Sequence, residues 1–155
     1  MRKLALMVIL VTCVAPSWAT VITTGDVDPG GAGTQPDPWM VVGTLSVGRT
    51  ADGTLNVEAG GVVASTDSRI GYSSGSTSEA TVTGTGSQWS NSGWLTVASS
   101  GSGTLNVTDG GMVSNTFGYI GYSTGSTGEV TVTGSGSQWN NSGYLYVGSS
   151  GDGTL

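Results

Sequence analysis

The sequence predicts an all-β protein, a right-handed parallel β-helix (β-solenoid) with about 25 residues and three short strands in each coil. A 50-residue block occurs twice without gaps, as residues 53–102 and 103–152, and its two copies differ at only 17 of 50 positions. Internal repetition on this scale is typical of solenoids, propellers and arrays. Inside each block apolar residues alternate with polar ones, which is the spacing of strands and not of helices. Several apolar and glycine positions also recur at half the length of the block.

The 25-residue step places apolar residues in columns that we expect to face the core. These columns are Leu45, Ile70, Leu95, Ile120, Leu145; then Val47, Tyr72, Val97, Tyr122, Val147; then Leu55, Ala80, Leu105, Val130, Leu155; and Val57, Val82, Val107, Val132. The residues that we predict to be buried and stacked are Leu95, Val97, Leu105, Val107, Ile120, Val130 and Val132. Strands are expected near residues 55–57, 61–63 and 70–72, with glycine- and serine-rich turns between them. Parallel crossovers are overwhelmingly right-handed, which sets the predicted hand.

The coils alternate in type, and this alternation pairs them into the 50-residue unit. One type carries a GG-x-V second strand and the other carries GxGSxW. A β-propeller is the alternative fold, but its blades need about 40–45 residues and four longer strands. The 25-residue unit is too short for a blade, so we favour the solenoid.

The amino terminus has the pattern of an export signal covering residues 1–19. Two basic residues precede the apolar run Leu4 to Val14, and small residues at Ser17 and Ala19 predict cleavage after Ala19. The alternative is a lipoprotein modified at Cys13. Residues 20–42 are then expected to form a leader that caps the first coil, and residues 43–155 to form the solenoid repeats. The chain stops just after a new repeat begins at Gly153, so we expect a fragment whose open end frays or self-associates end to end.

The repeat itself resembles one shared by type V secretion (autotransporter) passengers and PEP-CTERM exported proteins. The motifs that carry this resemblance are Gly103-Thr104-Leu105-Asn106-Val107, Ile120-Gly121-Tyr122, Val130-Thr131-Val132-Thr133-Gly134, Ser137-Gln138-Trp139 and Leu145-Tyr146-Val147-Gly148. The resemblance covers about residues 43–155. It implies a bacterial β-helical stalk that is secreted or displayed at the outer cell surface, and it brings no catalytic residues with it.

The composition excludes several classes of function. The chain has no histidine, which removes histidine-based triads, metal sites and proton shuttles. Its net charge of −6 argues against nucleic-acid binding. We therefore expect no enzyme, no cofactor and no metal site.

Two acidic clusters offer alternatives to that expectation. Glu79 and Glu129 share a register two coils apart, about 10 Å, near the spacing of an inverting glycosidase pair. Both precede an inward strand in a polar turn, so we favour a solubilising role. Asp26, Asp28 and Asp37 cluster ahead of the repeats and suit calcium by ligand type, but their spacing matches no calcium loop.

One candidate binding surface remains. The 25-residue step lines up Thr44, Arg69, Trp94, Tyr119 and Tyr144 in an outward column, with Tyr146 beside it. We predict that Arg69, Trp94, Tyr119 and Tyr144 form a ladder with Arg69 over Trp94, which is a surface suited to sugar rings. The alternative is a ladder that only stiffens the sheet. Trp89 and Trp139 are expected to fill the core or a corner.

These observations together favour a secreted or surface-exposed structural and adhesive passenger without catalysis. A carbohydrate-binding module that uses the aromatic ladder is the second interpretation, and a polysaccharide-acting β-helix enzyme is the third. The expected partner is an extracellular polysaccharide or a cell-surface matrix. No nucleic-acid partner and no membrane span are expected.

Overall fold

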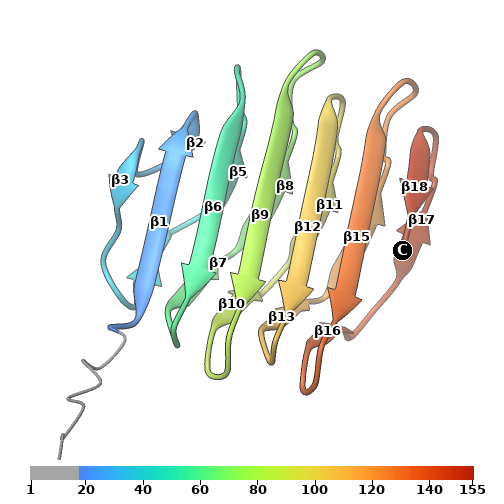
Figure 1. The fold of residues 1–155 in the computed structure, drawn as a ribbon. Coiled ribbons are helices and arrows are strands. Elements are labelled where there is room, and N and C mark those ends of the chain that lie inside the picture. Colours follow the sequence, from blue (N-terminus) through green and yellow to red (C-terminus); the bar gives the residue numbers. More distant parts are fainter. Residues whose placement is uncertain (1–17) are drawn as a thin grey trace, which may run out of the picture.

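The computed structural model describes residues 18–155, in which all regular structure is β-strand. The predicted signal peptide, including Cys13, lies outside the described residues except for Trp18 and Ala19. The strands form three sheets that run along the length of the molecule, and Figure 1 shows the long strands of one sheet lying side by side in chain order.

Each sheet takes one strand from each coil. Sheet A contains β3 (Gly33–Thr34), β1 (Thr20–Gly25), β6 (Gly53–Glu58), β9 (Thr77–Thr83), β12 (Ser102–Thr108), β15 (Thr127–Thr133) and β18 (Asp152–Thr154). Sheet C contains β4 (Trp39–Met40), β7 (Val62–Ser65), β10 (Gln88–Asn91), β13 (Met112–Asn115) and β16 (Gln138–Asn141). Sheet B contains β2 (Val27–Asp28), β5 (Thr44–Val47), β8 (Asp67–Ile70), β11 (Trp94–Val97), β14 (Phe117–Ile120) and β17 (Leu145–Val147).

Successive coils pair in parallel, which confirms the β-solenoid with three strands in each coil. Sheet A keeps the expected step throughout, so that Leu55 lies opposite Ala80, Ala80 opposite Leu105, and Leu105 opposite Val130. The neighbouring valine column, Val57 to Val132, has the same register. Both columns predicted for this sheet are correct over these residues.

A uniform step is wrong for the other two sheets. In sheet B, a short step from Val47 to Ile70 is followed by a long one from Ile70 to Val97, and then by a short one to Ile120. The second inward column there contains Leu45, Ser68, Leu95, Gly118 and Leu145. In sheet C the column is Trp39, Val63, Trp89, Val113 and Trp139, in which short and long steps alternate in the same way.

The lengths of the turns explain this alternation. Between sheets A and C the turn is residues 59–61 in one coil and residues 84–87 in the next, which is one residue longer. Between sheets C and B the turn is Thr66 alone in the first of these coils and residues 92–93 in the next, which is again one residue longer. Between sheets B and A the turn is residues 71–76 in the first coil and residues 98–101 in the next, which is two residues shorter. The changes cancel, so only sheet A keeps a constant step.

The third strand is also displaced from its predicted place. β8 ends at Ile70, because Gly71 has a positive φ of 67° and turns the chain out of the sheet. Tyr72 therefore lies in the turn between sheets B and A, called the third turn below, and not in the inward column. It is 40% exposed. Tyr122 repeats this arrangement one unit later and is 45% exposed.

The core is the continuous stack of inward side chains along the axis. It contains Leu95, Val97, Leu105, Val107 and Ile120, all fully buried, and Val130, which is nearly so. The prediction for Val132 is wrong, because this side chain is 38% exposed. β18 pairs only with residues 127–129 of β15, so nothing in the described chain covers the valine from that side.

The segment before the repeats covers the first coil. β1 runs antiparallel to β6 over its whole length, placing Val21 opposite Val57 and Thr23 opposite Leu55. β2 likewise pairs antiparallel with β5. Val21, Thr23 and Val27 are buried against the first coil. These strands therefore supply partners for edges of β5 and β6 that would otherwise be open.

Candidate functional site

The outward face of sheet B carries two rows of side chains. The Tyr119 row contains Ser46, Arg69, Thr96, Tyr119 and Tyr146. The Trp94 row lies two residues earlier along the chain and contains Thr44, Asp67, Trp94, Phe117 and Tyr144. The predicted single ladder is therefore wrong in register, because the alternating short and long steps divide its members between the rows. The sequence columns also missed Phe117 as a member of this face.

Aromatic rings on this face stack along the solenoid axis. Tyr119 stacks on Tyr146 with ring centroids 5.2 Å apart and an interplanar angle of 10°. Trp94 stacks on Tyr119 at 5.5 Å and 20°, across the two rows. Phe117 stacks on Tyr144 at 6.0 Å and 17°. Because these rings cover one another's faces, much of the strip presents ring edges to solvent and contributes packing between coils.

The cation–π partner of Arg69 differs from the predicted one. Its guanidinium lies over the ring of Tyr72, 4.9 Å from the centroid, and not over Trp94. The first unit below is residues 53–102 and the second unit is residues 103–152. In the second unit Tyr119 takes the place of Arg69 and meets Tyr122 edge to face, with ring centroids 5.1 Å apart. The tyrosine of each long third turn therefore covers the side chain at the same position of the preceding strand.

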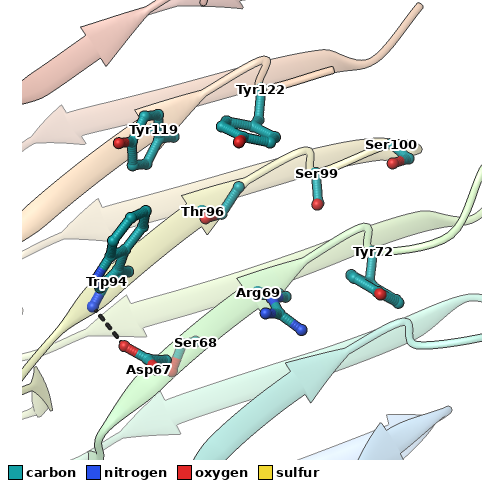
Figure 2. Close-up of a pocket in the computed structure, with 10 residues that line it drawn as sticks. All are labelled: Asp67, Ser68, Arg69, Tyr72, Trp94, Thr96, Ser99, Ser100, Tyr119 and Tyr122. Carbon is teal, nitrogen blue, oxygen red and sulfur yellow. Dashed lines mark hydrogen bonds between the residues drawn. The ribbon is translucent and has the colours of Figure 1, made fainter. Parts of the chain in front are cut away.

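A groove of about 500 Å³ lies where the two kinds of third turn alternate. Tyr72 and Tyr122 rise from long turns on either side, and the short turn with Ser99 and Ser100 lies between them (Figure 2). The remaining lining residues are Asp67, Ser68, Arg69, Trp94, Thr96 and Tyr119. Thr96 points outward by alternation but is only 8% exposed, because the larger side chains of Arg69 and Tyr119 flank it.

The short turn is held in place by backbone hydrogen bonds. The amide groups of Ser99 and Gly101 both donate to the carbonyl oxygen of Gly71, at 3.0 and 3.1 Å. Asp67 is also tied to the next coil, since its Oδ1 accepts the backbone N–H of Trp94 at 2.8 Å (Figure 2). The floor and one wall of the groove are therefore fixed by the backbone of neighbouring coils.

Several aspartates have a structural role that composition did not reveal. Asp37 Oδ1 accepts the backbone N–H of Val62 at 2.8 Å, and Asp52 Oδ1 accepts that of Thr77 at 2.6 Å. These bonds, like that of Asp67, cross from one coil to the next at a turn. The signal in the sequence is an aspartate placed about one coil before an amide at the start of a strand.

Each of the three aspartates that suit calcium by ligand type, Asp26, Asp28 and Asp37, has its own hydrogen-bond or ion-pair partner. Asp26 Oδ2 accepts hydrogen bonds from the backbone of Thr50 and Ala51 and from the Thr50 hydroxyl. These donors lower the pKa of Asp26 below 3.8, with the backbone N–H of Thr50 contributing most. Asp28 forms an ion pair with Arg49. Within residues 18–155, no three aspartate or glutamate side chains gather in a way that could hold a metal ion.

The predicted register of the two glutamates is correct. Glu79 lies opposite Thr104, which lies opposite Glu129, so the carboxylates are two coils apart on the outward face of sheet A. Glu79 Oε1 accepts a hydrogen bond from Asn106 Nδ2 at 2.7 Å. Both glutamates are exposed.

The tryptophans of sheet C belong to the core column. Trp89 is fully buried, and its Nε1 has no hydrogen-bond partner among the described residues. Trp139 is half-buried, and its Nε1 donates to Asn115 Oδ1 at 2.7 Å. The residue at the position equivalent to Asn115 in the first unit is Ser65, which bonds instead to Asn91 Oδ1 at 2.7 Å.

In the described part of the chain, no helix is long and apolar enough to cross a membrane.

Comparisons with known proteins add no relative, since no protein-family model, no curated protein and no solved structure matches this chain.

Proposed function

We propose that this chain is a structural and adhesive β-solenoid segment of a bacterial exported protein, of the autotransporter or PEP-CTERM kind, that carries out no catalysis. The observation that supports this most is the unbroken core. Inward side chains stack from Val21 to Val130 without an inserted loop or a gathering of charged groups. Such a stack makes a stiff rod, which is suited to holding a surface at a distance from the cell.

Export belongs to the same proposal. The basic residues Arg2 and Lys3, the apolar run after them and the small residues before Thr20 support a cleaved signal peptide. The protein then acts in an extracellular setting, where a continuous core with short turns and no long inserted loop in residues 53–152 resists proteases. Serine- and glycine-rich turns tied by backbone bonds to neighbouring coils favour the same property.

The experiment is to express the full chain in a Gram-negative host and to sequence the amino terminus of the exported form. We expect Thr20 as the first residue and a folded core that survives proteinase K under conditions that digest a control variant, Val107→Asp. A protein that stays in the cytoplasm with Met1 intact contradicts export. A wild-type chain that is digested as fast as the variant contradicts the structural role.

A second candidate function, carbohydrate binding by sheet B, is supported by a specific observation. Trp94, Tyr144 and Tyr146 are exposed large aromatic side chains gathered on one face. Exposed aromatic clusters on soluble proteins often mark binding surfaces. The test is retention of the purified chain on insoluble polysaccharides. Retention that is lost in Trp94→Ala supports this function. Failure of the wild-type chain to bind every polysaccharide tested contradicts it.

A further inference from the structure

The aromatic rings that contact Trp94 all come from the following coil of the described chain. Tyr119 stacks on the indole at 5.5 Å and 20°, and Phe117 meets it at 5.7 Å with an interplanar angle of 64°. In the preceding coil Asp67 and Arg69 stand on the outward face and line the groove together with Trp94 (Figure 2). Trp94 is 48% exposed. The aromatic stack of the described chain therefore ends at the groove with a half-exposed indole, and an indole is a surface that the C–H side of a pyranose packs against.

The alternating turns make the groove a slot with two side walls. Tyr72 and Tyr122 occupy equivalent places in turns two coils apart, so their backbones are separated by about 9.6 Å, twice the spacing between strands. The short turn between them contributes only Ser99 and Ser100 to the lining of the groove. This slot is one coil wide, which suits one sugar residue of a longer chain.

The polar groups of the groove comprise both donors and acceptors. Among residues 18–155 no carboxylate lies within 4.0 Å of the Arg69 guanidinium, which rests on the Tyr72 ring and keeps its N–H groups for a ligand. Asp67 supplies a carboxylate, and Thr96, Ser99 and Ser100 supply hydroxyls. Sugar hydroxyls both donate and accept hydrogen bonds, so this mixed set matches them.

The charges favour a neutral sugar over an acidic one. Arg69 and Asp67 both line the groove, and their charges offset each other there. The chain as a whole carries a net charge of −6, which repels a polyanion at long range. We propose that this groove binds one neutral hexose residue of a polysaccharide, with its C–H face on Trp94 and its hydroxyls toward Arg69 and Asp67. This inference rests on the carbohydrate-binding function above and assigns it to the groove instead of the aromatic ladder.

The second unit supplies the substitution that tests the proposal. Tyr146 stands there in place of Thr96 and stacks on Tyr119 in the adjacent strand. In the Thr96→Tyr variant the new ring lies between Arg69 and Tyr119 and fills the groove. The native fold accepts tyrosine at the equivalent position of β17, which has a neighbouring strand on one side only. We therefore expect Thr96→Tyr to remain folded, and its melting temperature is measured beside that of the wild type.

The experiment titrates the full chain with cellohexaose, a flat neutral hexose oligomer, and follows tryptophan fluorescence together with the indole N–H resonance of Trp94. We expect weak binding, in about the millimolar range for a single groove. Thr96→Tyr should weaken binding at least tenfold. The control variant is Thr81→Tyr, which adds a ring to the outward face of sheet A and should bind as the wild type does. Tyr144→Ala distinguishes the two candidate surfaces, because it removes an exposed ring of the ladder that does not line the groove.

Each contrary result overturns a different statement. Wild-type affinity in Thr96→Tyr, or loss of binding in Tyr144→Ala, overturns the assignment of sugar binding to the groove. Carbohydrate binding by the aromatic ladder then remains. Tighter binding of hexagalacturonate than of cellohexaose overturns the neutral-sugar assignment. Absence of binding to either oligomer, with no retention on polysaccharides, overturns carbohydrate binding altogether while the structural role is judged by export and protease resistance.

Discussion

Residues 53–102 and residues 103–152 build the same pair of coils, but they present different outward faces on sheet B. The inward positions of this sheet are the same in both units at Ile70 and Ile120, at Leu95 and Leu145, and at Val97 and Val147, and they differ only where Ser68 is replaced by Gly118. All four outward positions differ. Asp67, Arg69, Trp94 and Thr96 in the first unit correspond to Phe117, Tyr119, Tyr144 and Tyr146 in the second.

This difference separates two demands on the same strand. Inward side chains must fill a narrow core in which every neighbour is fixed, so few substitutions are accepted. Outward side chains meet mainly solvent and each other, so they can change while the coil stays the same. The first unit supplies most of the polar lining of the groove, and the second unit supplies most of the rings of the aromatic stack. If the two units share their core and differ mainly on their outward faces, equivalent substitutions in the core should have similar effects in both.

The largest effect is expected for a charge in the shared core. Val57→Asp and Val107→Asp each place a carboxylate in the same fully buried column of sheet A. We expect either variant to lose several kcal/mol and its cooperative unfolding transition, because the charge has no partner there. Circular dichroism during urea unfolding measures this. Ser90→Asp, on the outward side of β10, should stay within about 0.5 kcal/mol of the wild type, and a similar loss in that control would contradict the inward assignment.

A smaller effect separates the two tryptophans of the repeat. Trp89→Ala empties a fully buried site between Val63 and Val113, so we expect a loss of about 3–5 kcal/mol. Trp139→Ala removes a half-buried ring and one hydrogen bond, and should cost clearly less. Equilibrium unfolding in urea compares the two variants. Equal losses would show that the two units are packed alike at this position.

A polar exchange between the units should stabilise the first one. In the second unit Asn115 accepts a hydrogen bond from the Trp139 indole and donates one to Asn141 Oδ1. The pair Ser65→Asn and Ser68→Gly copies this arrangement, and gives the unpaired Nε1 of Trp89 an acceptor. We expect about 1 kcal/mol of added stability.

The two changes should depend on each other. Ser68 Oγ lies 2.8 Å from Ser65 Oγ, so Ser65→Asn alone is crowded, whereas Ser68→Gly alone loses the hydrogen bond to Asn91. A double-mutant cycle on the unfolding free energy is therefore expected to give a favourable coupling. Simple additivity would contradict the hydrogen-bond explanation.

The smallest effect concerns the segment that precedes both units. The pKa of Asp26 is lowered by the donors of Thr50 and Ala51, so its contribution to stability is present above the pKa of the unfolded chain and is lost as the pH falls through the folded pKa. Asp26→Asn should therefore reduce the fall in melting temperature between pH 7 and about pH 3. Thr50→Val, which keeps both backbone donors, should reduce it only partly. An unchanged acid dependence in Asp26→Asn would contradict this role.

The fold class and the strand register of sheet A could be predicted from the sequence. The three turns of a coil have the same total length in both types of coil, so equivalent residues of sheet A recur at a constant step. The sequence was insufficient for sheet B, where the register depends on the two turns in between. The longer GxGSQW and NSGW segments are visible in the sequence, but their compensation by a shorter third turn is not. The groove escaped prediction for this reason, since a uniform step puts Tyr72 and Tyr122 in the core and does not make Thr96 a neighbour of Tyr119 and Arg69.

The compensating turns also limit how a gene for such a protein can grow. Duplication of a single coil would set two coils of the same type side by side, with turns of equal length where the neighbours now differ and with tryptophan against tryptophan in the column that alternates Trp39, Val63 and Trp89. Duplication of two coils preserves every register and every large-to-small contact. Unequal recombination is therefore expected to leave viable proteins that differ by whole two-coil units, each lengthening the rod by about 9.6 Å.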